Sequence, residues 1–142
     1  MRILVGASLL AFVAGAWTST AAFNQPSQQP AAAAPSSVLD GVYTAEQATR
    51  GKDTFQKSCE ACHTVAEHTG KNLAANWGQS SLGDLFDLIS STMPDGDPGS
   101  LQPEAYASVI AFFLKESGYP EGKLDLPASS AALAKIRIAP LP

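Results

Sequence analysis

The sequence predicts an all-α fold. Three segments, near residues 44–58, 81–92 and 103–118, combine helix-capping residues with apolar side chains at helical spacing. Runs of alternating apolar and polar residues, the signal of a half-buried strand, are too few for a sheet. The 142 residues show no internal repeat, and the part after residue 37 is long enough for one domain but not for two. We therefore expect a single small helical domain over residues 38–142.

The first 22 residues have the layout of a secretory signal peptide. A basic Arg2 precedes an apolar run over residues 3–17, and the small residues Thr20-Ala21-Ala22 follow. The apolar run is shorter than the roughly 20 residues of a membrane-spanning helix. We expect cleavage near Ala22, a periplasmic location and no transmembrane span in the mature chain. Retention of this segment as an uncleaved anchor is the alternative.

Residues 23–37 consist mainly of Pro, Gln, Ala and Ser without charge or apolar periodicity. This composition predicts a flexible tether that does not pack against the domain. Loss of the signal peptide removes one basic residue, so 8 basic and 13 acidic residues remain and the net charge becomes −5. This negative charge argues against nucleic acid as a partner.

The first predicted helix runs from Thr44 to about Ser58. Thr44 and Gln47 match the capping box, in which each side chain binds the other residue's main-chain amide at the start of a helix. Gly51 lies inside this helix, one turn before Phe55, at a cost of about 1 kcal/mol relative to Ala. A close helix crossing at Gly51 explains that cost, and a merely tolerated glycine is the alternative.

Two further helices follow. One begins near Ser81, carries Asp84 three residues later, and ends before Met93-Pro94. The other begins at Pro103, which suits a first helical position, and ends at Gly118. Residues 119–142 have a weaker pattern, with a short helix or an extended segment over residues 130–138. We expect this C-terminal part to wrap across a core of about residues 42–118.

The segment Cys59-Glu60-Ala61-Cys62-His63 has the spacing of a covalent haem attachment site. Each thiol can add to one vinyl group of haem c, and the adjacent imidazole can ligate the iron. A zinc site is a poor alternative, because Cys62 and His63 are adjacent and only one other histidine, His68, exists. A thioredoxin-like dithiol is a second alternative, but such a dithiol is expected beside a βαβ pattern, and that pattern is missing here. We expect one covalent haem, held by Cys59, Cys62 and His63.

The second axial ligand has two candidates. Met93 is the only methionine left once Met1 is removed, and His68 is the only histidine besides His63. His68 follows His63 by five residues, which is too short a chain to cross the haem edge, so we expect His68 to be a solvated surface residue. Met93 lies on a Pro-flanked loop thirty residues after His63, and a thioether suits iron that works in two oxidation states. We expect His63 and Met93 as the metal ligands.

Four further residues have both a functional and an ordinary interpretation. Trp77 and Phe55 are candidates for packing against the haem, with the indole N–H of Trp77 directed at a propionate, and both also suit an ordinary core. Asp95 and Asp97 could aid docking to a basic partner, although acidic loop residues usually belong to solvated turns.

Phe55, the Cys59–His63 segment, Met93-Pro94 and the aromatic helix over residues 106–114 together resemble a class I c-type cytochrome. The resemblance implies a small helical domain wrapped around one haem, in which the first and last helices cross, at Gly51 and Phe55 against Val109 and Phe112. The run over residues 93–127 is similar to the cytochrome subunits and domains of quinoprotein dehydrogenases, which contain pyrroloquinoline quinone.

This resemblance implies an electron carrier rather than an enzyme. We expect an exported monohaem cytochrome c that takes an electron from a periplasmic dehydrogenase and passes it to an oxidase or another cytochrome. A haem enzyme or gas sensor with an open sixth coordination position is the alternative, since loss of Met93 ligation would leave the iron accessible.

Overall fold

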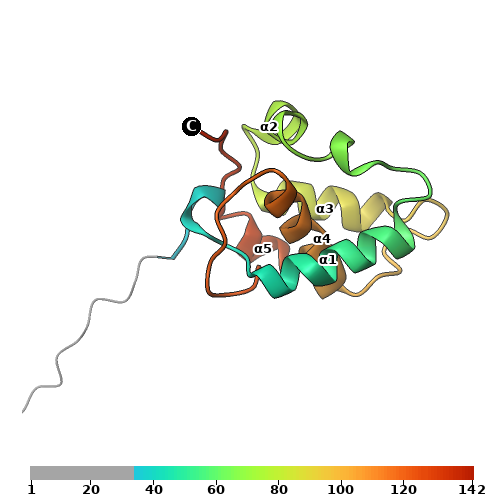
Figure 1. Cartoon of the computed structure of the whole chain (residues 1–142). Coiled ribbons are helices and arrows are strands. Elements are labelled where there is room, and N and C mark those ends of the chain that lie inside the picture. The colour runs from blue at the N-terminus through green and yellow to red at the C-terminus, as the bar shows by residue number, and fades with distance from the viewer. Residues whose placement is uncertain (1–33) are drawn as a thin grey trace, which may run out of the picture. The chain divides into compact units, whose positions relative to one another are not determined.

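The computed structural model describes residues 34–142, which form a helical domain (Figure 1). The expected signal peptide and most of the expected tether lie outside the described residues. The order of the helices, two of them 3₁₀ turns (η), is η1 Val38–Asp40, α1 Ala45–Ser58, η2 Val65–Glu67, α2 Lys71–Trp77, α3 Leu82–Thr92, α4 Pro103–Glu116 and α5 Ser130–Leu133. Between residues 34 and 142 there is no β-strand, so the predicted all-α class is confirmed.

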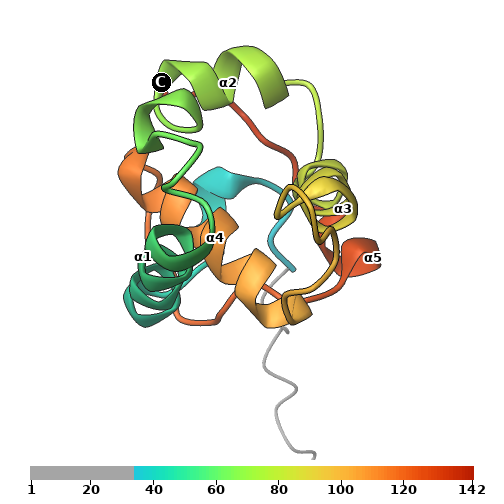
Figure 2. The same cartoon turned by 90° about the vertical axis from the view of Figure 1, so that its right-hand side faces the viewer.

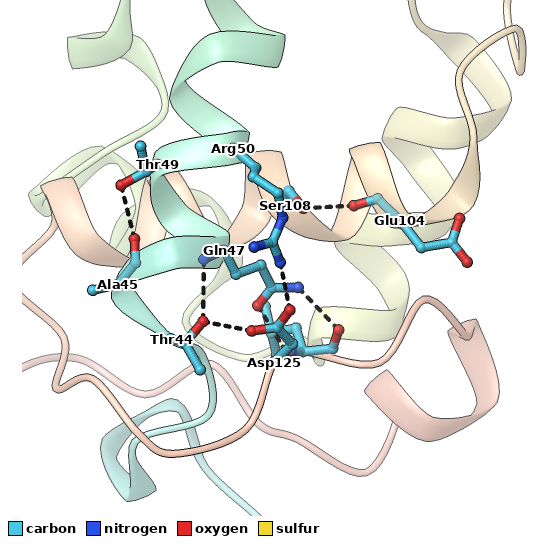
Figure 3. A network of polar contacts seen from close by, with 9 residues as sticks. Thr44, Ala45, Gln47, Thr49, Arg50, Glu104, Ser108 and Asp125 are labelled. Atoms are coloured by element: carbon cyan, nitrogen blue, oxygen red, sulfur yellow. Dashed lines mark hydrogen bonds and ion pairs between the residues drawn. The ribbon is translucent and has the colours of Figure 1, made fainter.

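The N-terminus of α1 confirms only half of the predicted capping box. The Thr44 hydroxyl accepts a hydrogen bond from the main-chain N–H of Gln47 at 3.1 Å. The Gln47 side chain does not return to Thr44. Its amide nitrogen donates to the main-chain oxygen of Leu126 at 3.0 Å, and its carbonyl oxygen accepts from the main-chain N–H of Leu126 at 2.7 Å. Gln47 therefore anchors the C-terminal segment, residues 119–142, instead of completing the cap (Figure 3).

Helices α1 and α4 pack against each other (Figure 2). Their closest approach is at Gly51, as predicted. A Cβ atom on Gly51 would lie 1.8 Å from the main-chain oxygen of Ser108 and 3.0 Å from the Cβ of Phe112. One turn further along α1, the Phe55 ring lies 5.8 Å from that of Phe112 and 5.7 Å from that of Phe113. Only glycine allows the two helices to approach so closely.

Helix α3 has a complete capping box. The Ser81 hydroxyl accepts from the main-chain N–H of Asp84 at 3.2 Å, and the Asp84 carboxylate accepts from the main-chain N–H of Ser81 at 2.8 Å. The hydrogen bond from the Ser81 main chain is the main reason why the pKa of Asp84 lies below its ordinary value of 3.8. The helix ends at Thr92, and the N–H of its C-cap residue Met93 donates to the main-chain oxygen of Ile89. Pro103 begins α4 and Gly118, with φ +87°, follows its end, so both predicted helices are confirmed.

The sequence analysis did not predict η2 or α2. Helix α2 has seven residues, its N-cap Gly70 has no side chain to cap it, and Leu73 is its only fully buried residue. A helix of this length is too short for a periodic apolar pattern to be recognised in the sequence. The two elements nevertheless return the chain from the Cys59–His63 segment to α3.

The C-terminal segment runs back over the first part of the domain. Leu133, Ile136 and Ile138 are buried, and the main chain of residues 136–138 is hydrogen bonded to Leu82, Ser80 and Val38. Helix α5 packs on α3, where Gly83 leaves room for the main chain of Ala134. Ser36, at the end of the segment expected to be a tether, accepts a main-chain hydrogen bond from Arg137 at 2.8 Å.

Two groups of buried apolar side chains stabilise this arrangement. The larger includes residues from α3, α4 and the C-terminal segment, and the smaller consists of Phe55, Val109, Phe112 and Phe113, with Cys59 and Val65 packed against it. None of the helices found in the described residues has the length and apolarity needed to cross a membrane. Residues of both groups line the cavity described next.

Candidate functional site

The domain contains a cavity of about 390 Å³. Its walls come from the end of α1, from α2, α3 and α4, and from the loop after α3, and the course of these helices can be followed in Figure 2. Most of the lining is apolar: Phe55, Leu73, Trp77, Leu85, Leu88, Ile89, Pro94, Leu101, Tyr106, Val109 and Phe113. This volume and lining are typical of a site for an organic cofactor.

The predicted attachment cysteines lie where α1 ends. Cys59 is the C-cap of α1, with its N–H donating to Phe55 at 2.8 Å, and it lines the cavity. A tight turn follows, in which the N–H groups of Cys62 and His63 both donate to the Cys59 oxygen at 3.0 Å. Cys62 is exposed and does not line the cavity. Both thiols are free, and burial raises the pKa of the Cys59 thiol.

His63, the predicted iron ligand, is half-buried and lines the same cavity. Its Nδ1 atom lies 3.9 Å from a carboxylate oxygen of Glu67. That carboxylate is oriented by the main-chain N–H of Thr64, which donates to it at 2.8 Å. This hydrogen bond is the main reason why the pKa of Glu67 lies below its ordinary value. Glu67 therefore places negative charge beside the imidazole of His63.

The expectation that His68 is a solvated surface residue is wrong. Its ring stacks on Phe113 at a centroid distance of 5.1 Å and lies edge-on to the His63 ring at 5.0 Å. Burial, and then the charge of His63, lower the pKa of His68. The cause is η2, which turns the chain back against α4 directly after the attachment segment.

His63, Glu67 and His68 form a group that sequence analysis missed. One ligand atom from each lies within 4.8 Å of the others, a separation that a single metal ion can bridge. The spacing of His63 and Glu67 by four residues was a visible signal. A metal bound there would use the same imidazole that the attachment motif assigns to iron.

Met93, the second predicted ligand, also lines the cavity. It follows α3 directly, and its main-chain oxygen accepts hydrogen bonds from Gly99 N–H at 3.2 Å and from the Tyr106 hydroxyl at 2.8 Å. Asp95 and Asp97, on the same loop, are exposed and do not line the cavity. Trp77 fits both of its interpretations, because it lines the cavity and also packs against the larger core group.

The donor set and the walls fit a haem. Cys59, His63 and Met93 supply a thiol, an imidazole and a thioether to one cavity, and Cys62 is one turn away. The apolar walls suit a porphyrin ring, whereas Asn72, Asn76 and Trp77 offer N–H donors for its carboxylates. Sequence analysis did not identify Asn72, Asn76 or Tyr106, since these residues carry no motif and only the fold brings them to the cavity.

Comparison with known families agrees with this chemistry. Residues 46–113 match the family model described as cytochrome c oxidase, cbb3-type, subunit III. The match supports a class I c-type cytochrome. The matched cytochrome c segment contains both cysteines, His63 and Met93, and it supports a haem-based electron carrier with redox protein partners. No curated protein and no solved structure matches the chain.

Proposed function

We propose that this chain is an exported monohaem cytochrome c that carries single electrons from a periplasmic dehydrogenase to a respiratory acceptor. The observation that carries the proposal is the shared apolar cavity, which is lined by Cys59, His63 and Met93 together. A thiol, an imidazole and a thioether are the groups that a covalently bound, doubly ligated haem requires.

Each residue of the site has a distinct task in this proposal. Cys59 and Cys62 form the thioether bonds, which fix the haem at the end of α1. The imidazole of His63 and the sulfur of Met93 would hold the haem iron as its two protein ligands. When bound, the haem supplies a one-electron Fe(III)/Fe(II) couple. The apolar walls exclude water, and the Met93 thioether favours the reduced state, so both raise the reduction potential.

An iron with both axial positions closed suits electron transfer and excludes substrates. For this reason we propose a carrier rather than an enzyme. The alternative, a haem enzyme or gas sensor with an open sixth position, requires that Met93 stays away from the iron. The two proposals therefore differ in the bond between the Met93 sulfur and the iron. Binding of carbon monoxide to the iron can test whether this bond exists.

Electron transfer also needs a part of the site near the surface. Leu88 lines the cavity and is 48% exposed, which makes it a candidate for the contact with redox partners. Transient redox complexes use small interfaces, and one exposed apolar side chain beside the cofactor suits such a contact. The similarity of residues 93–127 to quinoprotein dehydrogenase cytochromes favours a quinoprotein as the donor. The description of the matched family favours a terminal oxidase, or a carrier that leads to one, as the acceptor.

The decisive experiment is expression with the haem-attachment machinery, followed by spectroscopy of the wild type and of Met93→Ala. We expect mass spectrometry to find one covalently added haem in both proteins. Methionine-ligand absorption and resistance of the ferrous form to carbon monoxide should be present only in the wild type. Identical spectra, or a wild type that binds carbon monoxide readily at neutral pH, contradict His63/Met93 ligation. A colourless protein without added mass contradicts the haem itself and favours a dithiol oxidoreductase.

A further inference from the structure

We propose that Tyr106 is a positioning residue for the iron ligand Met93. Its hydroxyl holds the main chain of the loop over residues 93–101, called the Met93 loop below, and so keeps the thioether directed at the cavity. This inference rests on the proposed function, because it concerns the bond between Met93 and a haem iron.

The Tyr106 hydroxyl contacts both ends of the Met93 loop. It donates a hydrogen bond to the main-chain oxygen of Met93 at 2.8 Å and accepts one from the main-chain N–H of Leu101 at 3.4 Å. Tyr106 is only 4% exposed and lines the cavity beside Met93. A single buried hydroxyl therefore fixes the first and the last residue of this loop.

The other hydrogen bonds of the Met93 loop do not supply this connection. Gly99 donates to Met93, Asp97 donates to Pro94 and Ser100 donates to Asp97, so these bonds close turns within the loop. At its start the loop is continuous with α3 through the bond from Met93 N–H to Ile89. Within residues 34–142, Tyr106 supplies the hydrogen bonds that join the loop to α4.

Tyr106 itself is held on a rigid part of the fold. It lies in the second turn of α4, whose side chains from Tyr106 to Leu114 are all buried. Its ring packs edge-on against Phe86 of α3, with centroids 6.3 Å apart. The exposed Met93 loop is thus tied to a buried position at which α4 packs against α3, the kind of support that keeps a ligand in position.

Removal of the hydroxyl should weaken the Met93–iron bond without breaking it. The loop then samples arrangements in which the sulfur has left the iron, and a competing ligand binds in proportion to that population. The loss of one hydrogen bond corresponds to about a fivefold rise in the apparent affinity for carbon monoxide. The methionine-to-iron absorption band of the oxidised protein should weaken as well.

The test compares the haem-loaded wild type with Tyr106→Phe and with a matched control, Tyr119→Phe. Tyr119 is also 4% exposed, and its hydroxyl donates to a main-chain oxygen, that of Ala139, at 2.6 Å. It does not line the cavity. Both variants lose the hydrogen bond that a phenolic hydroxyl donates to a main-chain oxygen, so a general loss of stability affects both, and Tyr106→Phe also loses the longer bond from the Leu101 N–H. Only Tyr106→Phe should bind carbon monoxide more tightly and lose intensity in the methionine band.

Equal behaviour of the two variants in both measurements overturns the role of Tyr106 and leaves the proposed function intact. A wild type that already binds carbon monoxide readily contradicts Met93 ligation, and with it the proposed function. If Tyr106→Phe does not mature, hydrogen exchange in the wild type provides a second test. The Leu101 amide should then exchange as slowly as the amides of α4, and exchange at the rate of an open loop overturns the inference.

Discussion

At the scale of single residues, Gly51 shows how strongly one position can limit the fold. The main-chain oxygen of Ser108 lies where a Cβ atom would have to be, at 1.8 Å. For Gly51→Ala we expect a loss of about 3 kcal/mol in the free energy of unfolding, because α1 and α4 must move apart. Denaturant unfolding of the haem-loaded protein measures this loss.

Gly96→Ala is the control for Gly51→Ala. Gly96 has φ +89°, and no atom lies within 4 Å of an added Cβ. Gly96→Ala therefore strains the backbone but brings the new Cβ into contact with no other residue. It should lose only about 1 kcal/mol. Equal losses in the two variants would contradict the close approach of the helices.

Gln47 is a second residue whose side chain we expect to contribute strongly to the stability of the fold. It is 3% exposed and satisfies both main-chain groups of Leu126. Beside it, the Asp125 carboxylate accepts from the Thr44 hydroxyl and pairs with Arg50, so α1 holds this segment by several contacts (Figure 3). Gln47→Ala should lower the free energy of unfolding by about 2 kcal/mol, because buried polar groups lose their partners.

The exposed Gln56, on the same helix, provides the control for Gln47→Ala. Gln56→Ala should leave the denaturation midpoint nearly unchanged. A similar small effect of Gln47→Ala would show that the C-terminal segment does not depend on this side chain.

At the scale of elements, the capping box of α3 links stability to pH. The pKa of Asp84 is lowered chiefly by the hydrogen bond from the Ser81 main chain, so folding favours its charged form. The resulting stability is fully present above the unfolded pKa of about 3.8 and is lost as the pH falls through the lower pKa of the folded state. Asp84→Asn should therefore destabilise the protein at neutral pH and match the wild type increasingly below pH 3.8.

Unfolding free energies of Asp84→Asn and the wild type, measured from neutral pH down to about pH 3, check this prediction. Asp53→Asn is the control, because Asp53 is exposed and its side chain makes no hydrogen bond within residues 34–142. A difference between Asp84→Asn and the wild type that stays constant over the whole range would contradict the role of the charged cap.

The elements also show which signals a sequence carries. Helices α1, α3 and α4 could be predicted because each spans three turns or more and begins with Thr44, Ser81 or Pro103. Gln47 matches the local capping motif, but its side chain is hydrogen bonded to the main chain of Leu126 instead. Leu126 lies 79 positions away, so no local pattern reveals this partner. Helix α2 and the burial of His68 were missed because both depend on contacts with distant segments rather than on periodicity.

At the scale of the whole molecule, side chains of both buried apolar groups line one cavity of about 390 Å³. Without an occupant, the mostly apolar side chains that line this cavity would face water, which is unfavourable. We therefore expect the stability of the fold to depend on an occupant of this cavity.

We expect that the double variant Cys59→Ser/Cys62→Ser, which cannot bind haem covalently, loses its fixed tertiary structure. Near-ultraviolet circular dichroism should be weak, and thermal unfolding should lose its cooperativity. The single variant Cys62→Ser, which keeps the cavity-lining Cys59, should be intermediate. A double variant that unfolds cooperatively at the wild-type temperature would contradict the dependence of the fold on its cofactor.

The contact of Gly51 with Ser108 also constrains the order of events when the chain is made. The two positions belong to the first and the last long helix, so α1 lacks this packing partner until α4 folds against it. Until then Cys59 and Cys62, which follow α1, lie in a segment that an attachment enzyme can reach. We therefore expect covalent modification of the thiols to be easiest before these two helices pack together.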